Sequence, residues 1–376
     1  MKLVIFGLTV SSSWGNGHAT LWRGLFRALI RRGHQVVFFE RDVPYYAQHR
    51  DLTEIPGVRL VLYDSWETVL PLARQHLTGA DVGMVTSYCP DGVVASNLVL
   101  ASNARIRVFY DLDTPVTLDH VRAGRPVNYL PPYGLGDFDL VLSYTGGRAL
   151  DELKTMLGAR CVAPLYGSVD PEAHFPVEPK ERFRSDLSYL GTYAEDRQSA
   201  VEAFFVEPAR RLPHYRFMIG GALYPVDFPW TENIYFVRHL EPSLHSAFYC
   251  SSRFTLNVTR RAMAQSGFCP SGRLFEAAAC GVAVISDWWE GLDTFFDPWS
   301  EVVIARSTEH VVQALELSSE ESAEIGRRAR ERVLAGHTAD HRVTDLEAAL
   351  ELASGPVVQQ PDSGSPISQP LSVPET

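Results

Sequence analysis

Cysteine, lysine and long apolar runs are all scarce in this sequence, and each scarcity counts against a class of protein. The five cysteines form no C-x-x-C pair and no metal-ligand spacing, so the sequence predicts reduced thiols and no metal site. Lysine occurs only at Lys2, Lys154 and Lys180, and the formal net charge is -11. A nucleic-acid duplex is therefore disfavoured as the main partner, because phosphate binding needs clustered cations. Any basic site must be local and built from arginine, whose planar fork suits phosphate oxygens.

No uninterrupted apolar stretch reaches the ~20 residues that cross a bilayer, and the first residues show no cleavage pattern. We therefore expect a cytoplasmic protein with no membrane span, present as a monomer or a weak oligomer. Hydrophobic residues make up 45% of the chain and charged residues 21%, the balance of a globular protein that buries sizeable cores. A length of 376 residues predicts two domains and a tail.

Short apolar runs alternate with segments of helical spacing in both halves of the chain, which predicts βαβ units around parallel sheets. The runs are residues 2–8, 35–40, 58–63, 81–87, 106–113 and 140–144, then 186–191, 215–220, 234–237, 254–258, 282–286 and 301–305. We predict an α/β fold with two doubly wound, Rossmann-like domains that face a cleft. The predicted parts are a first domain over 1–167, a proline-punctuated linker over 168–185, a second domain over 186–336, a helix over 337–353 packed back toward the first domain, and a disordered tail over 354–376.

The loop after the first strand, SSSWGNGHAT, is a glycine-rich turn into a helix. Such a turn lets backbone N–H groups approach a ligand and aims the helix N-terminus at negative charge. His18 begins that helix, where we predict a catalytic or orienting imidazole, the alternative being a capping or packed histidine. The residues expected to contact substrate are Trp14, Gly15, Asn16 and Gly17.

The same loop has a rival interpretation as a dinucleotide-binding turn. Glu40 ends the next strand, where a ribose-binding acid would sit in such a site. The third glycine of that fingerprint is missing, because its position is Thr20. We therefore disfavour NAD binding at this loop.

Two carboxylates, Asp111 and Asp113, follow the apolar run IRVFY. We predict Asp113 as general base or sugar contact and Asp111 as a further substrate contact, since both end a strand at the cleft. Two alternatives stay open for this pair. A D-x-D pair also holds divalent metals in other enzymes, and Asp113 could simply cap the next turn.

In the second half, Pro270-Ser271-Gly272 begins a helix whose free N–H groups and Arg273 can bind a diphosphate. Glu276 lies one turn further, where its carboxylate can accept hydrogen bonds from ribose hydroxyls. The plain alternative is an i,i+3 pair with Arg273 on a solvated face. The predicted donor-binding residues are Gly191, Thr192, Tyr193, Arg197, His239, Leu240, Arg260, Ser271, Gly272, Arg273 and Glu276. Asp287 is expected to edge the cleft, and Tyr129 or Tyr133 to stack on an acceptor.

The segments WGNGHAT, FDLVLSYTGG, SVDPEAHF, DLSYLGTYAEDRQ and above all PSGRLFEAAACGVAVISDWWEGLDTFF resemble those of the CgeB-type glycosyltransferases, a branch of the GT-B superfamily. The resemblance spans roughly residues 1–345. It implies a nucleotide-sugar donor held mainly by the second domain, an acceptor in the first, and no required metal or cofactor. Related retaining enzymes carry two glutamates separated by seven residues. Glu276 matches the second, whereas the first position is Phe268.

The sequence therefore predicts metal-independent transfer of a sugar from a UDP-, GDP- or ADP-sugar to a hydroxyl of a small-molecule or glycan acceptor, with retention favoured. Two alternatives remain. A nucleotide-sugar 2-epimerase shares the two-domain arrangement, and a non-catalytic carbohydrate-binding relative would hold the donor without turnover.

Overall fold

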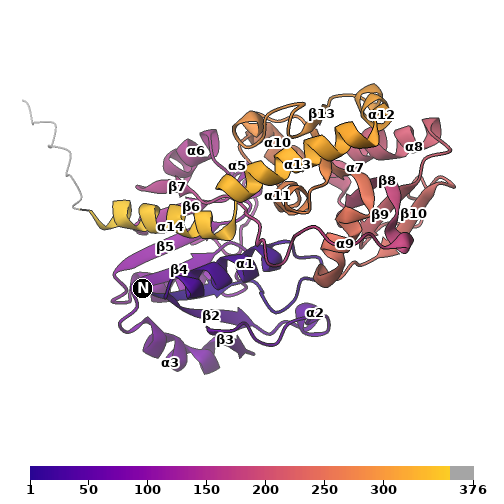
Figure 1. The fold of residues 1–376 in the computed structure, drawn as a ribbon. Helices are drawn as coiled ribbons and strands as arrows, with labels where there is room; N and C mark the ends of the chain where they lie inside the picture. Colours follow the sequence, from indigo (N-terminus) through magenta and orange to yellow (C-terminus); the bar gives the residue numbers. More distant parts are fainter. Residues whose placement is uncertain (356–376) are drawn as a thin grey trace, which may run out of the picture.

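The first half of the chain folds into a sheet of seven parallel strands. In this computed structural model, which describes residues 1–355, the strand order is β3-β2-β1-β4-β5-β6-β7, and the two domains lie side by side (Figure 1). In register, Phe6 lies opposite Phe39 on one side and Val85 on the other. The strands are β1 (Lys2–Gly7), β2 (Gln35–Arg41), β3 (Val58–Tyr63), β4 (Val82–Thr86), β5 (Ile106–Asp111), β6 (Leu140–Ser143) and β7 (Val162–Pro164).

The second half forms a six-stranded parallel sheet in the order β10-β9-β8-β11-β12-β13. Its strands are β8 (Ser185–Leu190), β9 (Phe217–Gly221), β10 (Ile234–Arg238), β11 (Ser252–Asn257), β12 (Ala283–Asp287) and β13 (Val303–Ala305). The two sheets confirm the predicted fold class of two doubly wound domains. Because all strands in each sheet are parallel, their carboxyl ends meet at one edge, which is where ligands bind in such folds.

Helices cover both faces of each sheet, so each domain has two apolar cores. In the first domain they are α1 (His18–Arg31), α2 (Pro44–Ala47), α3 (Trp66–Leu77), α4 (Gly92–Leu100), α5 (Thr114–Arg122) and α6 (Arg148–Leu157). In the second they are α7 (Glu195–Val201), which continues through a π-helical turn into α8 (Glu207–Arg211), then α9 (His245–Cys250), α10 (Arg261–Ser266), α11 (Gly272–Ala279), α12 (Thr308–Glu316) and α13 (Ser319–Gly336). The helical layers on either side of the sheets bury the apolar runs that predicted the strands.

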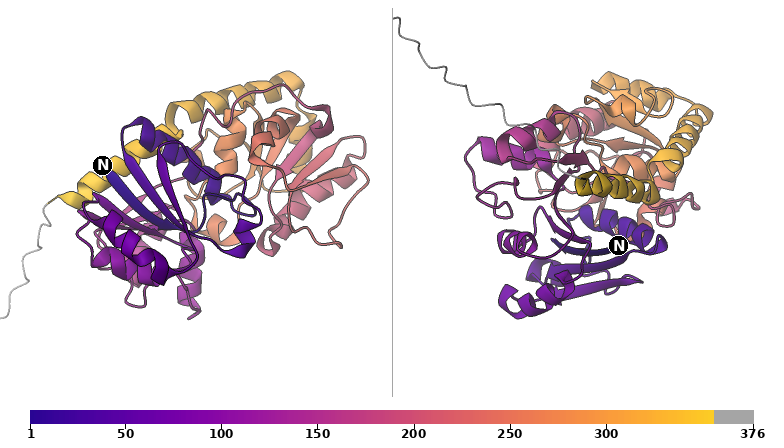
Figure 2. Two further views of the ribbon diagram at one scale, coloured as in Figure 1. Left: turned by 90° about the horizontal axis from the view of Figure 1, so that it is seen from below. Right: turned by 90° about the vertical axis from the view of Figure 1, so that its left-hand side faces the viewer.

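The last helix, α14 (Ala339–Ser354), leaves the second domain and lies on the first, as the views in Figures 1 and 2 agree. Val343, Leu346 and Leu350 share one buried cluster with Leu25 of α1 and Tyr110 of β5. From Thr308 onward the described chain forms three helices, α12, α13 and α14, and α14 covers most of the helix predicted over 337–353. Residues 356–376, the greater part of the predicted tail, lie outside the described residues.

The segment between the domains is fastened at its start. Asp170 forms an ion pair with Arg27 of α1 at 2.5 Å, and Val169 pairs with Thr338 at the entry to α14.

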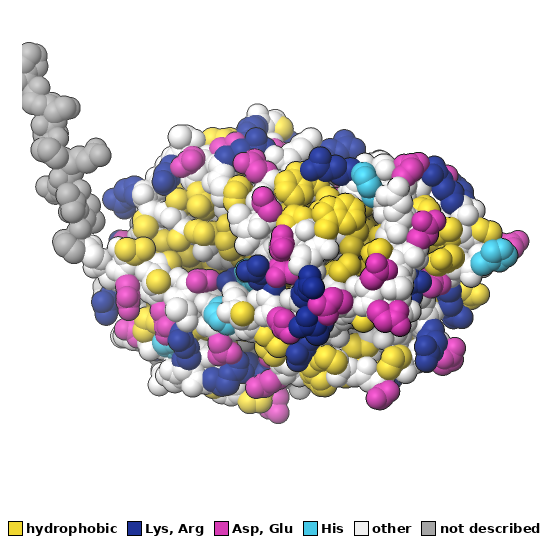
Figure 3. All heavy atoms as spheres, turned by 45° about the horizontal axis from the view of Figure 1, so that its top comes forward, with side chains coloured by type: hydrophobic (Ala, Val, Ile, Leu, Met, Phe, Trp, Pro, Cys, Tyr) yellow, Lys and Arg dark blue, Asp and Glu magenta, His cyan; other side chains and the backbone are white. Residues whose placement is uncertain are grey.

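On the face shown in Figure 3, cationic and anionic side chains are interspersed without an extended area of one sign. Within residues 1–355, no helix is both long enough and apolar enough to cross a membrane.

Candidate active site

A cavity of about 360 Å³ lies between the domains at the carboxyl ends of both sheets. The first domain contributes the loop after β1 and the loop after β5, and the second contributes the loops after β8, β9, β10 and β11 and the start of α11. Its polar lining residues include Ser13, Asn16, His18, Thr20, Asp113, Ser168, Thr192, Arg197, His239, His245, Tyr249, Thr259, Arg260, Ser271, Arg273 and Glu276. A second hollow of about 550 Å³ lies over α12 and α13, but Glu320, Glu321 and Glu324 line it, so it would repel a phosphate.

The loop after β1 is held by a buried carboxylate beneath it. Glu40 is 1% exposed and accepts hydrogen bonds from the backbone N–H groups of Val10 and Ser11 at 2.8 and 3.1 Å. The hydroxyls of Thr9 and Ser11 also donate to it. The carboxylate of Glu40 therefore holds the loop in shape. It is not available to bind a ribose in the way that the acidic residue of an NAD site does.

The N-terminus of α1 opens onto the cavity. Gly15 has φ +61°, a conformation that favours glycine, and Gly15, Asn16, Gly17 and His18 all line the cavity. The Asn16 side chain accepts from the His18 N–H at 3.1 Å and donates to the Thr9 carbonyl at 3.2 Å. The turn thus presents the imidazole of His18 and the start of the helix to a ligand.

His18 and Asp113 face each other from two loops of the first domain. His18 Nε2 lies 3.9 Å from Asp113 Oδ1, and both side chains line the cavity. Tyr88, at φ +63°, lies beside Asp113, and burial together with that carboxylate raises the pKa of its hydroxyl. An acid, an imidazole and a phenol therefore stand together on the first-domain side of the cavity, the set of groups from which proton-transfer chemistry is built.

The loop before α11 is attached to the first domain. The Tyr144 hydroxyl donates to the Pro270 carbonyl at 2.9 Å, the Thr145 hydroxyl donates to the Cys269 sulfur at 3.1 Å, and the Gly146 N–H donates to the Phe268 carbonyl at 3.0 Å. We call these three bonds the interdomain strap. Phe268 has φ +45°, and its ring is so close to Gly147 and Gly291 that a Cβ at either glycine would lie 2.5 Å from it. The position of the missing first glutamate is therefore a packing position between the domains and does not line the cavity.

The three predicted arginines of the donor site converge on the same cavity. Arg273 donates through Nε to the Leu190 carbonyl at 2.5 Å and through Nη1 to Asn257 Oδ1 at 2.9 Å. Gly191 allows this close approach, because a Cβ there would lie 3.0 Å from Arg273 Nη2. Arg197 is fixed by its bond to the Thr192 carbonyl at 2.6 Å, with its buried Nε unpartnered, and Arg260 by Asp196 at 2.8 Å. The guanidinium groups are oriented before any ligand arrives, which lowers the entropic cost of binding.

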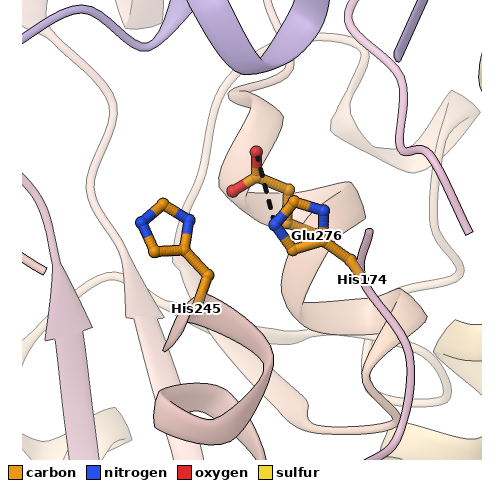
Figure 4. A group of neighbouring side chains, drawn as sticks. All are labelled: His174, His245 and Glu276. Carbon is orange, nitrogen blue, oxygen red and sulfur yellow. Dashed lines mark ion pairs between the residues drawn. The ribbon is translucent and has the colours of Figure 1, made fainter. Parts of the chain in front are cut away.

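Glu276 lies inside the cavity and not on a solvated face. Its two carboxylate oxygens lie 3.4 Å from the hydroxyls of Thr20 and Tyr249. Burial alone would raise the pKa of Glu276, but His174, His245 and Arg273 outweigh burial and lower it, so the carboxylate is ionised at neutral pH. Figure 4 shows the carboxylate between the two imidazoles, and within residues 1–355 these three side chains are the one group placed to hold a metal ion.

Four residues predicted for the site do not line the cavity. Asp111 is completely buried behind Asp113, whose N–H it accepts at 3.1 Å. Asp287 is half-buried, and its carboxylate accepts from the N–H and hydroxyl of Thr259. Both carboxylates support the loops that line the cavity.

The other two displaced residues are aromatic. Trp14 stacks on His49 with 4.1 Å between ring centroids and lies 4.2 Å from His239 of the other domain, which closes one side of the cleft. Tyr193 packs against Tyr224 with its ring. The suggested acceptor platforms Tyr129 and Tyr133 bond to Thr117 and Asn97 and do not line the cavity either.

Several lining residues, and His174 next to them, went unpredicted because nothing in their local spacing marks them. His245 and Tyr249 lie on the short helix α9, where their spacing is that of an ordinary buried face. His174 is brought beside Glu276 by the linker. A pairing of segments so far apart in the chain leaves no local periodicity from which to infer it.

Comparisons with known proteins agree with this architecture. Residues 197–348 match the model of a family described as glycosyl transferase-like. Comparison with curated proteins gives no match. Among solved structures, sucrose-phosphate synthase from Thermosynechococcus elongatus is 15% identical, with a TM-score of 0.68 over 94% of this chain and 100% of that one.

The HepE protein (Alr3699) of Anabaena, solved with UDP-glucose, is 13% identical, with a TM-score of 0.63 over 94% of this chain and 99% of that one. An alpha-glucosyltransferase solved with UDP and a 13-mer DNA containing an HMU base is 12% identical, with a TM-score of 0.66 over 93% and 99%. At such identities the likeness concerns the fold, which is the GT-B arrangement of two Rossmann-like domains.

Proposed function

We propose, from the premise that the chain is a transferase, that it moves a sugar from a nucleoside diphosphate sugar to an acceptor hydroxyl without a catalytic metal ion. The observation that carries this proposal is the convergence of three oriented arginines and a helix N-terminus on one interdomain cavity. Sugar transfer requires a site that stabilises a departing diphosphate while water is excluded. Cations and backbone N–H groups can supply that stabilisation.

The donor fits the second domain with its diphosphate at the start of α11. Ser271 caps this helix through its hydroxyl, which accepts from the Arg273 N–H at 3.4 Å, and its carbonyl accepts from the Leu274 N–H at 3.0 Å. The N–H groups of Ser271 and Gly272 are left for phosphate oxygens. One helix end contributes only about 0.3–1 kcal/mol when exposed, so Arg197, Arg260 and Arg273 must add charge-assisted bonds. Glu276, one turn further along the helix, would accept from the ribose hydroxyls.

The acceptor fits the first domain, where Asp113 and His18 are 3.9 Å apart. Asp113 would accept the proton of the acceptor hydroxyl or contact the transferred sugar, with His18 orienting the same group. Retention of the anomeric configuration is our working assignment, because the α11 segment resembles that of the two-glutamate retaining enzymes. NMR of the product reads the anomer directly, and an inverted product would contradict the assignment.

A uridine diphosphate sugar is the first donor to test, because two of the structural neighbours were solved with UDP or UDP-glucose. One of those neighbours binds DNA, but the net charge of -11 favours a small-molecule or glycan acceptor here.

The test is a thermal-shift screen of UDP, GDP and ADP in EDTA, followed by calorimetry on the best ligand. A nucleoside diphosphate should raise the apparent stability by mass action. Arg273→Ala should weaken its binding about 10- to 100-fold, the cost of losing charged hydrogen bonds. Arg327→Ala is the matched control, since this exposed arginine pairs only with glutamates of its own helix. Absence of binding by all three nucleotides, or equal affinity in Arg273→Ala, would refute the donor site.

Measurements of turnover distinguish a transferase from an epimerase and from a binding protein. Release of UDP that depends on an added acceptor supports transfer, while a changed sugar in the absence of acceptor indicates an epimerase. Tight donor binding with neither outcome across an acceptor panel indicates a binding protein. Activity that EDTA abolishes and a divalent ion restores would contradict the metal-independent assignment.

A further inference from the structure

We propose that His174, His245 and Glu276 form a binding site for a divalent transition-metal ion, and that an ion bound there excludes the sugar donor. One ligand atom from each residue lies within 4.8 Å of the other two. In Figure 4 the carboxylate lies between the two rings, with one nitrogen of His245 facing it. The three side chains come from the linker, from α9 and from α11, so the fold brings them together without any sequence motif.

The hydrogen bond of His245 fixes which of its nitrogens can bind a cation. Its Nε2 lies 3.3 Å from the Leu240 carbonyl, and because a carbonyl can only accept, Nε2 carries the proton. The lone pair of the neutral ring is then on Nδ1, which is buried without a partner. A histidine whose other nitrogen donates to a backbone carbonyl is the usual arrangement of a metal ligand.

His174 supplies an independent indication. The residue is 5% exposed, and neither of its ring nitrogens has a hydrogen-bond partner. A buried polar group without a partner is costly, so such a side chain points to an absent one. Its Nε2 lies 4.0 Å from Glu276 Oε1, which is too long for a hydrogen bond.

The same separation suits a cation between the two atoms. Zinc binds imidazole nitrogen and carboxylate oxygen at roughly 2.0–2.2 Å, so two ligand atoms of one ion are at most about 4.3 Å apart. At the tetrahedral angle usual for zinc the ligand atoms are about 3.4 Å apart, so the three side chains would draw together when the ion binds. Two imidazoles and a carboxylate are a ligand set for Zn²⁺ and its neighbours in the first transition row, while Mg²⁺ prefers oxygen alone.

A metal ion here would compete with the donor, and this part of the inference rests on the proposed function. His245 and Glu276 line the cavity, so the remaining coordination positions face the space that a nucleotide would enter. The ion would also engage the carboxylate that we assign to the ribose hydroxyls. Binding of the metal would then remove one of the contacts on which donor affinity depends.

The first experiment is a Co²⁺ titration of the untagged, EDTA-stripped protein, followed by the visible absorption of protein-bound Co²⁺. Wild type should saturate at one ion per chain. His174→Ala and His245→Ala should weaken binding about 10-fold or more, whereas His214→Ala, an exposed histidine outside the cluster, should not. Glu276→Gln, which keeps size and polarity, provides a third variant if an alanine variant fails to fold. Absence of Co²⁺ binding, or variants that bind like wild type, would overturn the proposal.

The second experiment measures UDP affinity with and without Zn²⁺. At a free Zn²⁺ concentration of about ten times its own Kd, the apparent Kd of UDP should rise about 10-fold in wild type and at most about 2-fold in His174→Ala, which also controls for chelation of zinc by the nucleotide. Equal UDP affinity with and without Zn²⁺ in wild type would overturn the exclusion of the donor. Failure of UDP to bind in EDTA would instead count against the proposed function, and the Co²⁺ titration would still decide the metal site.

Discussion

The position of Asp111 in the core disfavours the ionised form of its carboxylate. The carboxylate is completely buried at the end of β5, and burial raises its pKa to about 7. The folded protein therefore binds this proton more tightly than the unfolded chain, whose carboxyl titrates near about 3.9. Between about pH 4 and pH 7 the folded state holds the extra proton, so this group makes stability fall as the pH rises through that window.

Asp111→Asn should remove this pH dependence. The variant should lose less stability than wild type between pH 4 and pH 8, by up to about 4 kcal/mol, because the amide has no charge to desolvate. Urea unfolding at a series of pH values measures the slope. Asp293→Asn, at an exposed carboxylate, should leave the slope as in wild type. Parallel curves for wild type and Asp111→Asn would contradict the raised pKa.

Single residues were predictable where the chemistry is local. Ser271, Gly272, Arg273 and Glu276 occupy one short segment, and the start of a helix places them together whatever the rest of the chain does. Asp111 shows the limit of this reasoning. Two carboxylates two residues apart on a strand end look alike in the sequence, but only Asp113 lines the cavity.

The conformation of a structural element depends on its contacts with other segments, and the loop after β1 is an example. Glu40 accepts four hydrogen bonds from residues 9–11, so the end of β2 determines the shape of the loop after β1. The glycines of that loop could be recognised in the sequence, whereas the hydrogen bonds from the loop to Glu40 could not. The apolar runs predicted most strands for a simple reason, since strands buried on both faces are nearly continuous in hydrophobicity.

Glu40→Ala should destabilise the protein by about 2–4 kcal/mol, because it leaves buried N–H and hydroxyl groups without an acceptor. Chemical denaturation measures the change, and Glu241→Ala, at an exposed residue, is the control. The loop carries the lining residues Gly15 to His18, so donor or acceptor binding should weaken as well. A loss below about 0.5 kcal/mol would show that the loop holds its shape without this carboxylate.

Three features of the fold escaped the sequence patterns for physical reasons. β7 has only three half-buried residues, too few for any periodicity. β9 and β10 are joined by a loop in place of the helix that alternation predicts, and its aromatic residues pack on one another instead. The C-terminal helical segment divides at the capping box of Ser318 and Glu321 and again before α14.

At the scale of the whole molecule, α14 ties the end of the chain to the first domain. Leu346→Ala should lower the free energy of unfolding by about 2–4 kcal/mol, since the leucine is buried in the core that α14 shares with α1 and β5. Leu352→Ala on the same helix, at a residue 79% exposed, should change it by less than about 0.5 kcal/mol. Urea unfolding compares the two, and similar losses would mean that α14 does not complete the core.

The interdomain strap has a consequence for how the two domains can move. It joins the loop after β6 to the second domain, whereas Trp14, which meets His239 across the cleft, follows β1. Three strand spacings separate β1 from β6 in the sheet, roughly 14 Å at about 4.8 Å per spacing. If the strap stays intact, one domain rotates relative to the other about a hinge near Phe268. The cleft then opens on the side of Trp14, and a donor would enter there.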